Sequence, residues 1–257
     1  MKTSEHDLVL AHLNLFAVLK NLEELVVRDP ESARMTADWN ETIQFTVMGG
    51  PQAFLSFSGG RCTVGRGAAR KSTISLFFLS PRHLNRMFSE KANPIPVKGF
   101  LKLPFLAKKF PKLTERLEYF LKPTDALLKD PGYLALNTLF TLHTAAFAAA
   151  EMAAGEAFSR ASTAGLGSGS VLLKVLPEGP AAHIEFDKGK ITAKAGEAEK
   201  PAAFMYMKDL AVANAFLNQK MDAFAAIAKG EVAIWGQMPF LDALSRVLDR
   251  IPVYLAP

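Results

Sequence analysis

Two short segments, about half a chain apart, share one alternation of apolar and polar positions. Residues 53–64 (AFLSFSGGRCTV) and 181–193 (AAHIEFDKGKITA) each place alternating residues on both sides of a glycine-containing turn. This pattern predicts a β-hairpin in each segment. Alignment of Gly60 with Gly189 brings the two hairpins into register. We therefore expect an internal repeat in the chain.

After each hairpin, the predicted elements come in the same order in the two halves of the chain. A strand-like apolar segment comes first, at residues 72–79 and 202–207, and a helix start signal follows it. In the first half, Ser80 is the predicted N-cap and Pro81 the first helical residue, and in the second half Asp209 is the predicted N-cap. Agreement over consecutive features strengthens the expectation of a repeat.

Each repeat is predicted to end with a glycine-led strand and an amphipathic helix. The strands are expected at residues 98–103 (KGFLKL) and 229–236 (KGEVAIWG), and each leads to the tripeptide Pro-Phe-Leu. Apolar residues at helical spacing then predict closing helices that begin near Pro104 and Pro239.

A helical pattern also precedes each predicted sheet, at residues 6–28 and 132–162. Pro123 disfavours the continuation of a helix through the preceding residue, which makes this position a natural boundary. We expect an α+β fold with two units, residues 1–122 and 123–257.

Composition and charge narrow the classes of protein that fit. The 257 residues are 49% hydrophobic and 21% charged, which is enough apolar material for two buried cores. The formal net charge of +5 comes from 30 Lys and Arg against 25 Asp and Glu. Because no long Lys/Arg tract is present, the balance is not typical of a nucleic-acid binder, and we expect no nucleic-acid partner.

Three features predict a cytoplasmic location. Residues 5–7 (EHD) interrupt the first apolar run, unlike a signal peptide. Residues 133–150 carry no formal charge, but their threonines and alanines favour a buried helix over a membrane span. The single cysteine, Cys62, fits a reducing compartment and is interpreted as a small apolar core residue.

The positive charge is concentrated in residues 98–122, where seven basic side chains stand against two acidic ones and four phenylalanines are interleaved. A basic amphipathic segment with aromatic residues is typical of peripheral contact with an anionic membrane. A solvated helix face over a core stripe gives the same pattern, so both interpretations stay open. The residues predicted to meet the membrane are Lys98, Lys102, Lys108, Lys109, Lys112 and Arg116.

No local motif predicts catalysis, a metal or a cofactor. The glycine-rich residues 59–73 suggest a phosphate-binding loop, but Arg70 stands where a glycine is required before Lys71, and a strand-like segment follows instead of a helix. The five histidines show no metal-ligand spacing with Cys, Asp or Glu, and no G-x-S-x-G sequence is present. We therefore expect no catalytic residue, no metal and no cofactor.

Residues 189–244 resemble the sterol carrier protein type 2 family. The family pattern A-x-x-x-G-x-(V/L)-x-(I/L)-x-G stands here as Ala226, Gly230, Val232, Ile234 and Gly236. The first half resembles a diverged member. There Gly99, Leu101 and Leu103 match the pattern, but no glycine is expected to answer to Gly236.

The resemblance implies two sterol-carrier-like units, each a mostly antiparallel sheet covered on one face by helices that enclose an apolar tunnel. It also implies binding or transfer of a lipid-like small molecule, which could be fatty acyl, sterol-like or isoprenoid. The residues expected to form the pocket wall are Phe204, Met205, Met207, Phe216, Leu217, Met221, Phe224, Ile227, Trp235, Met238 and Phe240.

Three function classes follow from this sequence. The first is a non-enzymatic carrier with an internal apolar pocket. The second is an interaction module that assembles with a lipid-handling enzyme or holds it at a membrane. The third is an enzyme that acts on a lipid thioester or a quinone precursor, for which no local motif is present. The sequence leaves the oligomeric state open.

Overall fold

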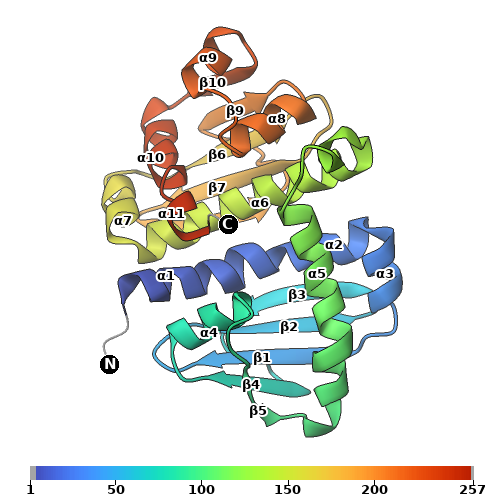
Figure 1. Cartoon of the computed structure of the whole chain (residues 1–257). Helices are drawn as coiled ribbons and strands as arrows, with labels where there is room; N and C mark the ends of the chain where they lie inside the picture. Colours follow the sequence, from blue (N-terminus) through green and yellow to red (C-terminus); the bar gives the residue numbers. More distant parts are fainter. Residues whose placement is uncertain (1–3, 256–257) are drawn as a thin grey trace. The chain divides into compact units, whose positions relative to one another are not determined.

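The chain forms two compact units in the computed structural model, which describes residues 4–255. Unit 1 extends to Tyr119 and unit 2 begins at Phe120. Each unit contains one five-stranded sheet and several helices (Figure 1). The prediction of a mixed fold with two sheets and packed helices is confirmed.

Unit 1 consists of a long helical segment, a sheet and two later helices. Its helices are α1 (Glu5–Leu13), α2 (Leu22–Arg28), α3 (Pro30–Thr36), α4 (Pro81–Phe88) and α5 (Phe110–Leu121), the last of which continues across the division. Its strands are β1 (Glu41–Val47), β2 (Gln52–Ser58), β3 (Arg61–Arg66), β4 (Ile74–Phe78) and β5 (Ile95–Lys98). Shorter turns of π-helix occupy Asn14–Val18 and Phe105–Lys109, and 3-10 turns occupy Leu19–Asn21 and Phe100–Lys102.

Unit 2 repeats the order of the strands and main helices of unit 1 and has two additional short helices. Its helices are α6 (Pro131–Gly155), α7 (Ala157–Thr163), α8 (Leu210–Leu217), α9 (Ala223–Ala228), α10 (Met238–Leu248) and α11 (Pro252–Leu255), of which α9 and α11 are the additional ones. Its strands are β6 (Gly169–Val175), β7 (Ala181–Asp187), β8 (Lys190–Ala195), β9 (Ala203–Met207) and β10 (Val232–Gly236). A 3-10 turn at Leu127–Lys129 precedes α6.

The two sheets have one topology. Their strand orders are β3-β2-β1-β4-β5 and β8-β7-β6-β9-β10. The central strand pairs in parallel with the fourth strand of its unit, β1 with β4 and β6 with β9, and every other pairing is antiparallel. The first strand of each unit is therefore the middle of its sheet, and the hairpin and the last two strands extend to opposite sides.

The sequence pattern located the hairpins correctly but missed the central strands. The two predicted hairpins form β2–β3 and β7–β8, and the predicted caps are present. The Ser80 hydroxyl accepts a hydrogen bond from the His83 amide at 3.2 Å, and the Asp209 carboxylate accepts one from the Val212 amide at 2.8 Å. Strands β1 and β6 are largely buried along their length, so a simple alternation does not mark them.

The strand predicted at residues 98–103 is wrong, because the structure places β5 at Ile95–Lys98. Two prolines obscure this strand in the sequence, and Pro96 is tolerated because β5 is at the sheet edge. Gly99 follows β5 with φ +85°, where a Cβ atom would collide with the Thr73 carbonyl oxygen.

Gly236 ends β10 in the same way. Its φ is +100°, and a Cβ atom there would collide with the Ala202 carbonyl oxygen. Gly99 therefore occupies the position in its sheet that Gly236 occupies in unit 2. The expectation that no glycine of the first half answers to Gly236 is wrong. The sequence pattern aligns Gly99 with Gly230, whereas the structure aligns Gly99 with Gly236.

The helix predicted at residues 132–162 is divided at Glu156. The backbone of Glu156 is extended, with ψ 129°, and its carboxylate caps α7. Among residues 4–255, no helix combines the length and the apolar character that a bilayer span requires.

Candidate apolar ligand site in unit 2

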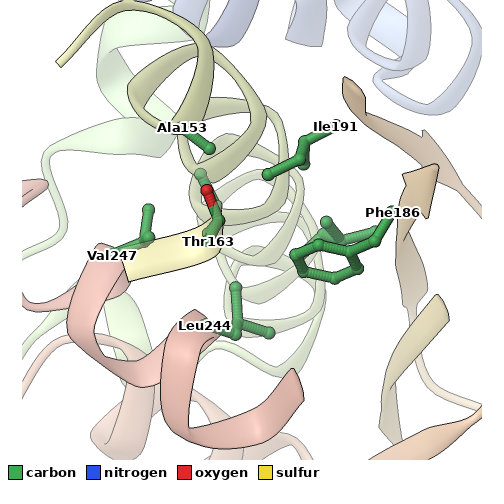
Figure 2. Close-up of a pocket in the computed structure, with 8 residues that line it drawn as sticks. Ala153, Thr163, Phe186, Ile191, Leu244 and Val247 are labelled. Carbon is green, nitrogen blue, oxygen red and sulfur yellow. The ribbon is translucent and has the colours of Figure 1, made fainter. Parts of the chain in front are cut away.

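An apolar gap lies between the sheet of unit 2 and the helices that cover it (Figure 2). It encloses about 170 Å³ of empty space, part of it open to solvent, and no point in it is wide enough for a water molecule. The residues that line the gap come from α6, α7, β7, β8 and α10. They are Ala149, Ala153, Thr163, Ile184, Phe186, Ile191, Leu244 and Val247.

The space is present because the side chains of α6 that line it are small. Ala149 and Ala153 are four residues apart and therefore lie on one face of the helix. Both are buried, so the side of the space that they line faces the interior of unit 2. Larger side chains in these two positions would close it.

The lining has no charged or nucleophilic group. Thr163 carries the one polar side chain, and its hydroxyl hydrogen-bonds to the carbonyl oxygens of Ser159 at 3.0 Å and Arg160 at 3.2 Å. Because the hydroxyl bonds within its own helix, the gap offers a ligand mainly hydrocarbon contacts. Such a surface suits apolar chains.

An ion pair between the buried carboxylate of Glu156 and the partly exposed Arg250 joins the start of α7 to the end of α10. Arg250, which follows α10, donates from Nε and from the terminal guanidinium nitrogen to Glu156 Oε1 at 2.9 and 2.8 Å. The Glu156 carboxylate also accepts hydrogen bonds from the Ser159 amide at 2.8 Å and the Ser159 hydroxyl. This clamp holds the end of α10 against the start of α7.

The surroundings of Glu156 act on its pKa in opposite directions. Burial raises the pKa, but the hydrogen bonds from Ser159 and Arg250 lower it by more, so the net shift is below the ordinary value. The carboxylate therefore stays ionised at neutral pH although its side chain is only 5% exposed. The sequence analysis missed this clamp, since Arg250 is 94 residues away from Glu156 in the chain.

The residues predicted to form the pocket wall divide into three groups, and none of them lines the gap. Met207 and Phe240 are buried, and Phe240 packs against Phe186 of the lining with ring centroids 5.2 Å apart. Half-buried members are Phe204, Met205, Phe216, Leu217 and Met221. Exposed members are Phe224, Ile227, Trp235 and Met238.

Two of these predicted wall residues belong to an aromatic cluster on β9 and β10. Trp235 stacks on Phe204 with ring centroids 4.9 Å apart, and Tyr206 meets Trp235 edge-on at the same separation. Phe204 and Tyr206 alternate along β9 with the buried Ala203 and Met207, so the cluster is on the opposite face of the strand.

The six basic residues predicted to meet a membrane differ from one another in whether they have an acidic partner. Arg116 is bound to the buried Asp29, with its Nε and a terminal nitrogen each 2.9 Å from a carboxylate oxygen. Lys102 pairs with Glu41 at 2.6 Å, and Lys109 is 4.0 Å from Asp38. The remaining three are exposed, and among residues 4–255 none of them pairs with a carboxylate: Lys98, Lys108 and Lys112.

Other groups that could carry chemistry are not assembled into a site. Cys62 is buried, and burial raises the pKa of its thiol, which disfavours the reactive thiolate. Within the part of the chain that the structure describes, no three His, Cys, Asp or Glu side chains are grouped to hold a metal ion.

Comparison with protein families places the similarity in unit 2. Residues 153–249 match the SCP-2 sterol transfer family. The resemblance predicted for residues 189–244 lies within this range and is confirmed. The match extends from the end of α6, through the whole sheet, to the residue after α10. Comparison with curated proteins gave no match.

Several solved structures of low sequence identity resemble part of the chain, among them these three. Palmitated SCP2L2 from Aedes aegypti is 15% identical, with 32% of this chain and 73% of that chain covered and a TM-score of 0.26. A conserved hypothetical protein from Thermus thermophilus, described as possibly a sterol carrier protein, is 22% identical, with coverages of 41% and 81% and a TM-score of 0.32. The UbiJ-SCP2 ubiquinone synthesis protein is 13% identical, with coverages of 52% and 99% and a TM-score of 0.31.

Proposed function

We propose that this protein is a non-enzymatic carrier of an apolar lipid, which unit 2 holds in the gap between its sheet and α6, α7 and α10. The observation that carries the proposal is the match of residues 153–249 to the SCP-2 sterol transfer family. The matched range contains every lining residue of the gap except Ala149, although it includes only the last three residues of α6. The hydrocarbon lining is consistent with an apolar ligand.

The gap must widen before it can hold a lipid. It has no room for a water molecule, whereas most ligand pockets have volumes of roughly 300–1,000 Å³. Helix α10 is the proposed moving element, because its Leu244 and Val247 line the gap. An outward shift of α10 would separate these side chains from the sheet and open a continuous apolar channel.

The proposal is tested by filling the gap. Ala153→Leu adds three carbon atoms at the lining and should weaken the binding of a fluorescent fatty acid by about tenfold or more. Ala213→Leu is the control, because Ala213 is also buried in unit 2 but does not line the gap. Urea unfolding of both variants measures the cost of overpacking separately from the loss of binding.

Native mass spectrometry of the purified protein supplies a second measurement. A lipid that remains bound under native conditions and is released on denaturation would support the carrier function. Equal fatty-acid affinity for the wild type and Ala153→Leu, with both folded, would show that the ligand is held elsewhere. The residues around α8, which include Phe216 and Leu217, would then be the next place to test.

We also propose that unit 1 is a second copy of the same fold. The common sheet topology supports this, and so does a second clamp. Asp29 caps α3, accepts hydrogen bonds from the Ser32 amide at 3.0 Å and hydroxyl at 2.7 Å, and binds Arg116. Glu156, Ser159 and Arg250 repeat this arrangement in unit 2.

Under this proposal, an alignment of the two clamps pairs residues of unit 1 with residues that line the gap. Counting back from Asp29 and Glu156 aligns Leu22 with Ala149 and Val26 with Ala153. Counting back from Arg116 and Arg250 aligns Phe110 with Leu244. In each pair the residue of unit 1 is the larger one.

Aromatic side chains fill the corresponding region of unit 1. The ring of Trp39 is 5.1 Å from that of Phe57 and 4.7 Å from that of Phe105, and Phe57 is 6.4 Å from Phe110. Leu22 and Val26 are at most 1% exposed. We infer that unit 1 packs its core where unit 2 leaves a gap, and that the chain carries its ligand in unit 2 alone.

A further inference from the structure

The turn after β5 exposes three apolar side chains around Lys102. Leu101 is 95% exposed, Phe100 is 61% exposed and Leu103 is 40% exposed. Large apolar side chains that extend together into water usually mark a contact surface. No such turn is present in unit 2, where only two residues separate Gly236 from Pro239, whereas four separate Gly99 from Pro104.

The turn is fixed to the end of the sheet, so its exposure is a property of the fold. The Lys102 amide donates to the Gly99 carbonyl oxygen at 2.8 Å, and Lys102 Nζ binds Glu41 at the start of β1. Gly99 packs closely against Thr73, which immediately precedes β4. These contacts hold the backbone while Phe100 and Leu101 remain in solvent.

Positive charge surrounds the turn. Lys108 and Lys112 are one helical turn apart, and both are exposed without a carboxylate partner among residues 4–255. Lys98 donates to the Ser72 carbonyl oxygen at 2.6 Å, which leaves its charge uncompensated. Arg70 and Lys71, both exposed, directly precede Ser72 and so add to the charge at this end of the sheet.

We propose that residues 98–112, the docking surface, bind unit 1 to an anionic lipid bilayer. Phe100, Leu101 and Leu103 enter the interface between headgroups and acyl chains, and the lysines contact the lipid phosphates. This goes beyond the carrier function, because it requires no ligand in unit 2. Arg116 has no part in it, since its guanidinium is bound to Asp29.

The combination of groups favours a bilayer over the other partners of a basic surface. A nucleic acid would pair with the lysines but leave the aliphatic side chain of Leu101 in water. A bilayer satisfies both kinds of group, with charge at the headgroups and apolar volume beneath them.

The experiment is co-sedimentation of the full chain with vesicles of phosphatidylcholine alone or mixed with phosphatidylglycerol. We expect binding to the anionic vesicles only, with affinity that falls as salt rises. The apolar variant Phe100→Ser/Leu101→Ser should weaken partitioning by about tenfold or more. The charge variant Lys108→Gln/Lys112→Gln should weaken it by about fivefold for each lysine.

Matched controls come from the opposite end of the same sheet. Met48 and Leu79 follow the carboxyl ends of β1 and β4 and are 57% and 54% exposed. Met48→Ser/Leu79→Ser and Arg82→Gln/Lys91→Gln therefore change two exposed apolar side chains or two exposed basic side chains outside the docking surface. Both control variants should bind vesicles like the wild type.

Three results would overturn the proposal. They are wild-type binding by both test variants, equal binding to the two kinds of vesicle, and equal losses in the controls. Association with RNA or another protein but not with vesicles would assign the surface to a different partner. Fatty-acid binding measured on the same variants separates this proposal from the carrier function, since Phe100→Ser/Leu101→Ser should bind fatty acid normally.

Discussion

At the scale of single residues, the most consequential side chains are two buried carboxylates that cap helices. Asp29 and Glu156 each begin a helix, accept hydrogen bonds from a serine three residues later, and bind an arginine from the closing helical region of the unit. Each carboxylate therefore combines a helix cap with a tertiary ion pair. Removal of either arginine leaves a buried charge without its partner, which is costly.

The clamp in unit 2 gives a pH-dependent prediction. Arg250→Met should lower the free energy of unfolding by roughly 2 kcal/mol at pH 7, because the arginine is partly exposed and its ion pair partly screened. The pKa of Glu156 is lowered in the folded protein, so the stabilisation is present above the ordinary glutamate pKa of about 4.3 and is lost as pH falls through the folded value.

Urea unfolding at pH 7 and pH 3 checks this prediction. The difference between the wild type and Arg250→Met should be large at pH 7 and should shrink at pH 3. Arg246→Met is the control, because Arg246 and Asp242 form an exposed pair that should contribute less than about 1 kcal/mol at either pH. An equal loss of unfolding free energy in the two variants at pH 7 would show that the Glu156–Arg250 pair stabilises the protein no more than an exposed ion pair does.

The glycine that ends the last strand of each sheet gives a second prediction at this scale. Gly99→Ala and Gly236→Ala should each destabilise the protein by more than about 1 kcal/mol, because φ is positive and the new methyl group meets a carbonyl oxygen. Gly59→Ala is a useful comparison, since Gly59 also has positive φ but nothing lies near its Cβ position. Thermal unfolding should rank Gly59→Ala as the mildest of the three.

At the scale of elements, the sequence predicted the features that depend on near neighbours. Hairpins, helix caps and closing helices were recognisable because their signals lie within a few residues of one another. Strand β5 was misplaced since Pro96 interrupts its pattern, and the central strand β6 was missed because its buried residues are nearly continuous. The gap in unit 2 could not be predicted, because residues that are distant in the chain, such as Ala149 and Leu244, line it together.

The mobility proposed for α10 can be measured by hydrogen exchange. Without added ligand, the amides of α10 should exchange faster than those of β6, which is bonded on both sides in its sheet. A bound fatty acid should slow exchange in α10 and leave β6 unchanged. Uniform protection of α10 and β6 in the free protein would contradict an opening at this helix.

At the scale of the whole molecule, the two units have one topology but different interiors. Unit 2 has alanines at positions 149 and 153, where the proposed alignment places Leu22 and Val26 in unit 1. Unit 1 instead presents an exposed apolar turn, Phe100–Lys102, which has no counterpart between β10 and α10. The common order of elements was predictable from the sequence, but the different interiors of the two units depend on packing between residues that are distant in the chain.

The number of lipids bound by each chain tests the proposal that only unit 2 carries a ligand. Native mass spectrometry with excess fatty acid should show one lipid for each chain, because the proposed counterpart of the gap in unit 1 is occupied by Trp39, Phe105 and Phe110. Ala153→Leu should reduce the occupancy of that single site. Two lipids of similar affinity for each chain would show that unit 1 also opens.

The closed state of the gap has a consequence for the speed of lipid exchange. No water fits between Leu244 and the sheet, so under the proposed function a lipid can enter only after the protein has opened. The observed rate of loading would then rise with lipid concentration at first and level off at the opening rate of the protein. Delivery would be timed by the protein's own fluctuations, so a carrier of this kind could hold its cargo for long periods without strong binding at any one contact.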